Sequence, residues 1–153
     1  MRLGVISDTH GLLRPEALLA LRGVHLIIHA GDVGAPEILT QLKAIAPVFA
    51  VRGNVDTQRW ALELPLTTVV QTSGASLYVL HNLRELDLKP GASGFDAVIT
   101  GHTHQAGQHE HAGVFYLNPG SAGPRRFQLP VTLAILELGS KPWRAEIVQL
   151  LAN

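Results

Sequence analysis

The feature that most limits the possible folds is a series of short apolar runs. Each run is rich in β-branched residues, has the length of a strand and is bounded by Gly, Pro, Asp or Asn. The runs lie at residues 3–6, 24–28, 48–51, 67–71, 76–80, 95–100, 114–117, 131–138 and 144–151. The sequence therefore predicts a domain built largely from strands.

Two predicted helices separate the first three runs. Residues 14–23 have Pro15 near the start and Gly23 as a stop, and residues 35–47 repeat the pattern with Pro36 and Pro47. Strands alternating with helices favour right-handed crossovers and parallel strands. The second half is mostly strands, with residues 71–76 as a hairpin turn. We therefore predict one mixed α/β domain over residues 1–153, containing two sheets.

Composition narrows the classes of function. The chain has 153 residues, of which 46% are hydrophobic, and 12 Lys+Arg balance 12 Asp+Glu. A neutral chain has no basic surface for nucleic acid or an acidic membrane. It has no cysteine, which excludes disulfides and thiolate metal sites. No run approaches a membrane span or signal peptide, so we predict a cytoplasmic protein and leave a homo-oligomer open.

An Asp, His or Asn residue follows several of the predicted strands. In a parallel α/β sheet the carboxyl ends of the strands lie at one edge, where ligands bind. The residues after the first three strands are expected to converge there, and the later histidines can join if their strands end at the same edge. The seven candidates are Asp8, His10, Asp32, Asn54, His81, His102 and His104.

These seven side chains form a ligand set for divalent metals. Carboxylate, imidazole and amide oxygen ligands suit Mn²⁺, Fe, Zn²⁺ or Co²⁺ better than Mg²⁺ alone, because four of the seven are imidazoles. Seven ligands suit two ions if one carboxylate bridges them. Two ions about 3.5–4 Å apart lower the pKa of a shared water and stabilise in-line displacement at phosphorus. The sequence therefore favours metal-dependent phosphoryl chemistry.

Each candidate also has an ordinary structural explanation. Asp8 and Asp32 could cap a turn or a helix, Asn54 could be a turn residue, and His81 could be a buried, hydrogen-bonded histidine. All seven residues lie just after predicted strands, and this shared placement favours one common metal site over seven unrelated structural roles.

The ordered motifs resemble those of a known superfamily. "SDTHG", "HAGD", "RGNVD", a lone His81, "GHTH" and "NPGS" occur between Asp8 and Ser121. This order is similar to that of the calcineurin-like metallophosphoesterases, above all their small prokaryotic phosphodiesterase branch, which is related to the retromer scaffold subunit.

The resemblance implies a four-layer α/β/β/α sandwich of two mixed sheets flanked by helices. It also implies that Asp8, His10 and His104 bind one metal, that Asn54, His81 and His102 bind a second, and that Asp32 bridges them. The metals are expected to be Mn²⁺, with Ni²⁺, Fe, Zn²⁺ or Co²⁺ as alternatives. A bridging hydroxide would attack a small phosphodiester in line, with Asp8, His10, Asp32, Asn54 and His81 as the catalytic residues.

The chain departs from the wider superfamily pattern at three places. Val55 stands where larger members have a histidine that protonates the leaving oxygen, so His10, Asp56 or solvent would have to supply that proton. Asn82 replaces a glycine after His81. Residues 82–94 offer little helix, which predicts a short outer layer and a more open site.

Other candidates and functions carry less weight. Arg52 and Asn54 could bind the substrate phosphate, and Arg52 could equally form an ion pair. His25 and His29 are better explained by burial or exposure, and His109 and His111 by a solvated strand or turn. The alternatives to a phosphodiesterase are a protein-binding scaffold that keeps the fold, a phosphomonoesterase and a nuclease.

Overall fold

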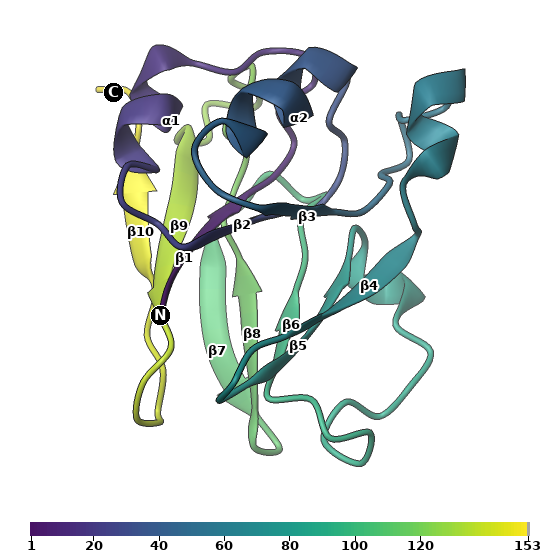
Figure 1. Ribbon diagram of the computed structural model, residues 1–153, viewed down its shortest axis with the longest axis vertical. Helices are drawn as coiled ribbons and strands as arrows, with labels where there is room; N and C mark the ends of the chain where they lie inside the picture. The colour runs from purple at the N-terminus through teal and green to yellow at the C-terminus, as the bar shows by residue number, and fades with distance from the viewer. Residues whose placement is uncertain (153) are drawn as a thin grey trace.

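The computed structural model describes residues 1–152 and contains two five-stranded sheets that face each other (Figure 1). Sheet A has the order β10 (Glu146–Gln149), β9 (Thr132–Glu137), β1 (Arg2–Ile6), β2 (Leu26–His29), β3 (Val48–Ala50). Sheet B has the order β4 (Thr67–Gln71), β5 (Ser76–Leu80), β6 (Ala97–Ile99), β8 (Val114–Asn118), β7 (Gly107–His111). The predicted α/β class with two mixed sheets is confirmed.

Both sheets are mixed, and each contains three parallel strands. In sheet A, β1, β2 and the edge strand β3 run parallel, whereas β9 pairs antiparallel with β1 and β10 pairs antiparallel with β9. In sheet B, β5, β6 and β8 run parallel, with β4 and β7 antiparallel at the two edges. The parallel strands bring the carboxyl ends of β1, β2 and β3 together, and likewise those of β5 and β6.

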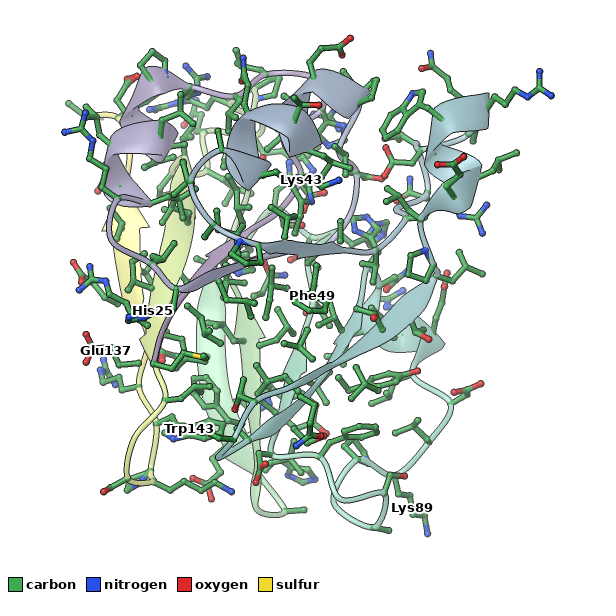
Figure 2. All side chains as sticks on the ribbon, viewed as in Figure 1. His25, Lys43, Phe49, Lys89, Glu137 and Trp143 are labelled. Atoms are coloured by element: carbon green, nitrogen blue, oxygen red, sulfur yellow. The ribbon has the colours of Figure 1, made fainter. Side chains whose placement is uncertain are left out.

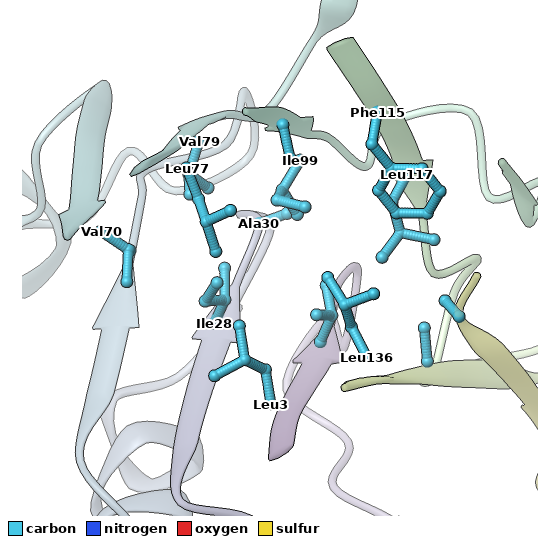
Figure 3. Close-up of a cluster of buried hydrophobic side chains, with 14 of the residues drawn as sticks. Leu3, Ile28, Ala30, Val70, Leu77, Val79, Ile99, Phe115, Leu117 and Leu136 are labelled. Atoms are coloured by element: carbon cyan, nitrogen blue, oxygen red, sulfur yellow. The ribbon is translucent and has the colours of Figure 1, made fainter. Parts of the chain in front are cut away.

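Apolar side chains on alternating positions build two cores around sheet A. Leu3 and Ile28 face sheet B and meet side chains such as Leu77 and Ile99 between the sheets (Figure 3). The opposite face of sheet A, including Ile27, packs against the helices. Burial on both faces explains why the central runs read as continuously apolar.

Two helices cover the outer face of sheet A, at the top of Figure 1. These are α1 (Pro15–Ala20) and α2 (Pro36–Lys43), each with proline in its first turn as predicted. Both end earlier than the predicted ranges. The 3₁₀ helix η1 (Arg59–Glu63) was not expected from the sequence.

The outer face of sheet B has a reduced layer. Residues 82–94 contain only the short 3₁₀ helix η2 (Leu83–Glu85), in agreement with the missing helix pattern. Leu86 and Leu88 of this segment, together with Phe95 directly after it, pack on Tyr78, Leu80 and other outward-facing side chains instead. The fourth layer is therefore a loop rather than an α-helix.

The far end of the sandwich is closed by the connection from β9 to β10. Figure 2 shows Trp143 there, away from α1 and α2. Its ring meets Phe115 of β8 edge-on, with centroids 6.3 Å apart. Within residues 1–152, no helix has the length and apolar character needed to cross a membrane.

Candidate metal centre

All seven predicted ligand residues come together at one edge of the two sheets. Asp8 and His10 follow β1, Asp32 follows β2 and Asn54 follows β3. His81 follows β5, and His102 and His104 follow β6. Backbone hydrogen bonds join these segments, since His10 N–H donates to Asp32 O and Gly101 N–H to His81 O, each at 3.0 Å. The convergence therefore results from parallel pairing in both sheets.

Asp8 is fully buried, and its two carboxylate oxygens have different surroundings. Oδ2 accepts hydrogen bonds from Ser7 Oγ at 2.7 Å and from the His102 N–H at 3.0 Å. Oδ1 has no hydrogen-bond partner among the described residues. It lies 3.3 Å from His104 Nε2 and 3.7 Å from His10 Nε2. One oxygen thus fixes the carboxylate while the other faces imidazole nitrogens.

Asp32 repeats this arrangement. Its Oδ1 accepts a hydrogen bond from the Val55 N–H at 3.0 Å. Its Oδ2 lies 3.1 Å from His81 Nε2 and 3.8 Å from His10 Nε2. Asp32 therefore reaches histidines on both sides of the site, and so does Asp8, whose Oδ1 is 3.9 Å from His81 Nε2.

The remaining donors complete the second half of the site. His81 Nδ1 lies 2.7 Å from the Ala30 carbonyl, which fixes the proton on Nδ1 and leaves Nε2 free as a ligand atom. Asn54 Oδ1 lies 3.0 Å from His81 Nε2 and 3.1 Å from His102 Nδ1. Asn54 and His102 are exposed, so this side of the site faces solvent.

The donor set fits divalent metal ions. Two groups of ligand atoms lie within coordinating range of one another, Asp8 with His10 and His104, and Asp8 with Asp32 and His81. A buried carboxylate oxygen without a hydrogen-bond donor, next to three imidazole nitrogens, is what a bound cation would satisfy. The absence of thiolate ligands favours the borderline metals that accept nitrogen and oxygen.

The electrostatics agree with cation binding. Burial would raise the pKa of Asp8, but the neighbouring His10 and His104 imidazoles outweigh it and hold the pKa well below its ordinary value. Burial would lower the pKa of His81, yet its contact with Asp32 and the nearby Asp8 charge raise it. Two ionised carboxylates therefore create a negative potential at this edge.

Most of these residues have a strained backbone. Asp8, His10, Asp32, His102 and His104 have φ of 56°, 46°, 57°, 75° and 62°, the left-handed region that L-residues rarely adopt. Only Ala112, Phe127 and Gln128 share this property among the other non-glycine residues of the described chain. Such strain costs roughly 1–3 kcal/mol per residue and clusters at functional sites. The tight turns direct these side chains back over the strand ends.

Two glycines allow the segments to approach closely. A Cβ on Gly53 would lie 2.1 Å from Asp32 Oδ1 and 2.2 Å from the Asp32 backbone nitrogen. A Cβ on Gly101 would lie 2.0 Å from Ser7 Oγ and 2.7 Å from Asp8 Oδ2. Glycine at these two positions therefore leaves room for the two carboxylates, which any larger side chain would displace.

Several supporting residues were missed or misread in the sequence. Asp56, considered as a proton donor, instead accepts hydrogen bonds from the N–H groups of Val33, Gly34 and Gly53. It ties the turn after β2 to the turn after β3. Its position in "RGNVD" gave no signal of this, because two of its partners lie more than twenty residues away in sequence.

His29 is buried, as expected, and it also supports the site. Its Nδ1 accepts the Gly31 N–H at 3.1 Å, so Nε2 carries the proton and donates to Thr9 Oγ1 at 3.0 Å. Thr9 Oγ1 in turn donates to Val33 O at 2.8 Å. His29 therefore joins the segments that carry Asp8 and Asp32. Complete burial lowers its pKa to about 4.

The remaining residues considered in the sequence lie outside the group of seven. Arg52 is half-buried, and the hydrogen bonds and ion pairs described for residues 1–152 do not link its side chain to the seven. His109 and His111 lie on β7, away from the site, as a solvated strand. Asn118 and Ser121 tie the end of β8 and the segment after it to the site, because Asn118 Nδ2 donates to Gly101 O and Ser121 Oγ donates to Asp8 O, both at 2.9 Å.

Comparison with known proteins identifies the family. The calcineurin-like phosphoesterase superfamily domain matches residues 1–141. A probable metallophosphoesterase of Methanothermobacter thermautotrophicus is 37% identical over 97% of this chain and 92% of its own length. A phosphodiesterase of Methanocaldococcus jannaschii is 26% identical over 97% of this chain and 100% of its own. This chain therefore belongs to the calcineurin-like phosphoesterase superfamily.

A solved structure shows the same fold. Vps29 of Entamoeba histolytica, solved in complex with Zn²⁺, covers 98% of this chain and 99% of its own. The two are 22% identical, with a TM-score of 0.74. The likeness confirms the sandwich fold expected from the resemblance.

Because the backbone at His102 is strained, we expect glycine at this position to give a more stable protein than alanine, which reverses the usual order. In chelated protein, we expect His102→Gly to be more stable than His102→Ala by about 0.5 kcal/mol or more, because alanine keeps the left-handed strain and glycine removes it. Urea unfolding of both variants measures the difference. Ala44 is the control, because its φ of −68° is ordinary and Ala44→Gly should destabilise. A less stable His102→Gly would contradict the strain.

Burial of neutral His29 predicts loss of stability in acid. Because its folded pKa is about 4 and its ordinary value is 6.5, the unfolded chain binds more protons between these values. Stability contributed by neutral His29 is therefore present above pH 6.5 and falls as the pH drops towards 4, by on the order of 3 kcal/mol. Urea unfolding of chelated protein across this window should show the fall. His29→Gln, which does not titrate, should show a flatter profile, and equal slopes would contradict the assignment.

Proposed function

We propose that this chain is a metal-dependent phosphodiesterase that acts on small phosphodiesters. The observation that carries the proposal is the pair of carboxylates, each with one oxygen anchored by hydrogen bonds and the other facing imidazoles. The relative from Methanocaldococcus jannaschii is named a phosphodiesterase, and the relative from Methanothermobacter thermautotrophicus a probable metallophosphoesterase. The location would be cytoplasmic.

The residues divide between two divalent ions, for which Mn²⁺ is our first choice. Asp8, His10 and His104 would hold one ion, and Asn54, His81 and His102 would hold the other. Asp32 would be shared, in keeping with its contacts to both His10 and His81. When bound, the ions supply positive charge for the phosphoryl oxygens and lower the pKa of a shared water.

The chain orients the substrate from the exposed side. Asn54 and His102 are the exposed members of the site, whereas Asp8, Asp32 and His81 are buried. A phosphate group therefore approaches past Asn54, whose amide nitrogen is available to a phosphoryl oxygen. Arg52 remains a predicted phosphate-binding residue, placed directly before Gly53 and Asn54.

A protein-binding scaffold is the second candidate, favoured by the similarity to Vps29. A scaffold has no physical use for five strained residues that converge on one point, because the strain only lowers its stability. A nuclease is disfavoured by the neutral charge. A phosphomonoesterase differs only in substrate, which an assay decides.

The first experiment compares esters and metals. Metal-stripped protein should regain hydrolysis of bis(p-nitrophenyl) phosphate when Mn²⁺ is added, and should cleave the monoester more slowly. Asp32→Ala should lower diester turnover by about 100-fold or more and reduce the bound metal measured by elemental analysis, because it removes the shared ligand. Asp87→Ala, at an exposed aspartate, is the matched control. Full turnover by folded Asp32→Ala would overturn the shared role, and no turnover with any metal would favour the scaffold.

Val55 predicts a dependence on the leaving group. Its side chain is 46% exposed beside Asn54 and cannot donate a proton, while its backbone N–H holds Asp32. Val55→His keeps that N–H and adds a donor. We expect it to raise kcat for an unactivated alkyl diester by about 10-fold or more and to change p-nitrophenyl diesters much less. Equal effects on both esters would show that protonation does not limit the rate.

A further inference from the structure

A large cleft lies on the outer face of sheet B, beside the metal centre. Its volume is about 850 Å³, within the range of small-molecule sites. It is lined by residues 82–84, 100–103, 105–109 and 116–118. His102 belongs to both the cleft and the metal centre, so the cleft continues from the point where a phosphate would lie.

The cleft exists because the layer over sheet B is a loop. Leu86, Leu88 and Phe95 cover part of this face. Beyond them, His109 on β7 is exposed and Tyr116 on β8 is half-buried. A phosphate alone would fill a small fraction of the space, so the cleft has room for the organic group of an ester.

Two rings line the cleft as a stacked pair. His109 and Tyr116 are cross-strand partners, with ring centroids 5.1 Å apart and an angle of 4° between the ring planes. Parallel rings on neighbouring strands offer an aromatic face on which a further planar ring can stack. This arrangement suits a heterocyclic base better than an aliphatic chain.

The polar lining is cationic and rich in amides. Arg84 is exposed, and the lining residues include no carboxylate. Asn82 Oδ1 accepts the Arg84 N–H at 3.1 Å and so caps the η2 turn. The asparagine that replaces the usual glycine therefore fixes the turn that carries Arg84. A lipid tail would need a more continuous apolar lining, whereas a base with ring nitrogens and carbonyls matches these donors and acceptors.

We propose that this cleft binds the organic group of the substrate and that this group is a nucleoside. Its base stacks on the His109–Tyr116 pair, with Arg84 beside it, while the phosphate lies at His102. The inference rests on the proposed function for the placement of the phosphate. The neutral chain limits the substrate to the size of one or two nucleotides rather than a long polyanion.

Titration calorimetry measures how much each part of the ligand contributes to the binding affinity. The full chain loaded with Mn²⁺ is titrated with inorganic phosphate, ribose 5-phosphate and adenosine 5′-monophosphate. The last two differ by the base alone. We expect the base to tighten binding by about tenfold or more, as stacking on aromatic side chains typically does.

Variants locate the base. His109→Ala and Arg84→Ala change exposed residues, and each should remove most of the gain from the base while leaving affinity for inorganic phosphate unchanged. Arg22→Ala, at an exposed arginine after α1, is the charge-matched control and should keep the gain. Thermal unfolding checks that all variants are folded.

The outcomes distinguish this inference from the proposed function. Equal affinity for the nucleotide and ribose 5-phosphate would overturn the nucleoside assignment, as would a gain that both variants retain. Neither result would argue against the proposed hydrolysis of diesters. Conversely, nucleotide binding that depends on His109 in a chain that cleaves no diester would refute the phosphodiesterase and keep the cleft.

Discussion

The structure depends on burying two carboxylates at the meeting edge of two sheets. An isolated buried charge is costly, and it is tolerated only when hydrogen bonds and opposite charge compensate it. One oxygen of Asp8 accepts hydrogen bonds from Ser7 Oγ and the His102 N–H, and one oxygen of Asp32 accepts a hydrogen bond from the Val55 N–H. The other oxygens face imidazoles. The turns, glycines and strand registers at this edge serve to hold that arrangement.

The backbone strain at the site lowers the stability of the fold, and other parts of the chain hold the strained turns in place. Five of the candidate ligand residues occupy left-handed conformations that a stability optimum would assign to glycine. The buried network of Asp56 and His29 holds these turns in place through backbone hydrogen bonds. The cores on both faces of sheet A supply the rigidity that such strain requires. These hydrogen bonds within the chain fix the positions of the candidate ligands.

The reduced fourth layer gives the two sheets different roles. Sheet A is sealed by α1 and α2 and supplies Asp8, His10, Asp32 and Asn54 through its tightly held turns. Sheet B supplies the other three histidines, and its outer face is only partly covered by the loop that starts at Asn82. The same missing helix that opens the cleft leaves His102 exposed at its end. The proposed ester-binding cleft and the candidate metal centre thus meet at one residue.

Local patterns in the sequence predicted nine of the ten strands in residues 1–152, both helices and the seven ligand candidates, whereas the exposed strand β7 was not among the predicted runs. A strand end followed by Asp, His or Asn is readable because the chemistry and the turn lie within a few residues of each other. The shortened α1 and α2 and the unexpected η1 were less readable, because helix ends depend on the packing around them.

Only the tertiary structure decided which distant groups support the site. Asp56 bonds to backbone groups 22 and 23 residues away, and Thr9 bonds to His29 across 20 residues. The cleft likewise arises from pairing His109 with Tyr116 across two strands and from a segment that fails to cover them. The sequence by itself therefore determined which atoms are available for chemistry, because residue type and local turns are local properties. Their separations, and the space beside them, were decided by strand pairing and packing between segments far apart in the chain.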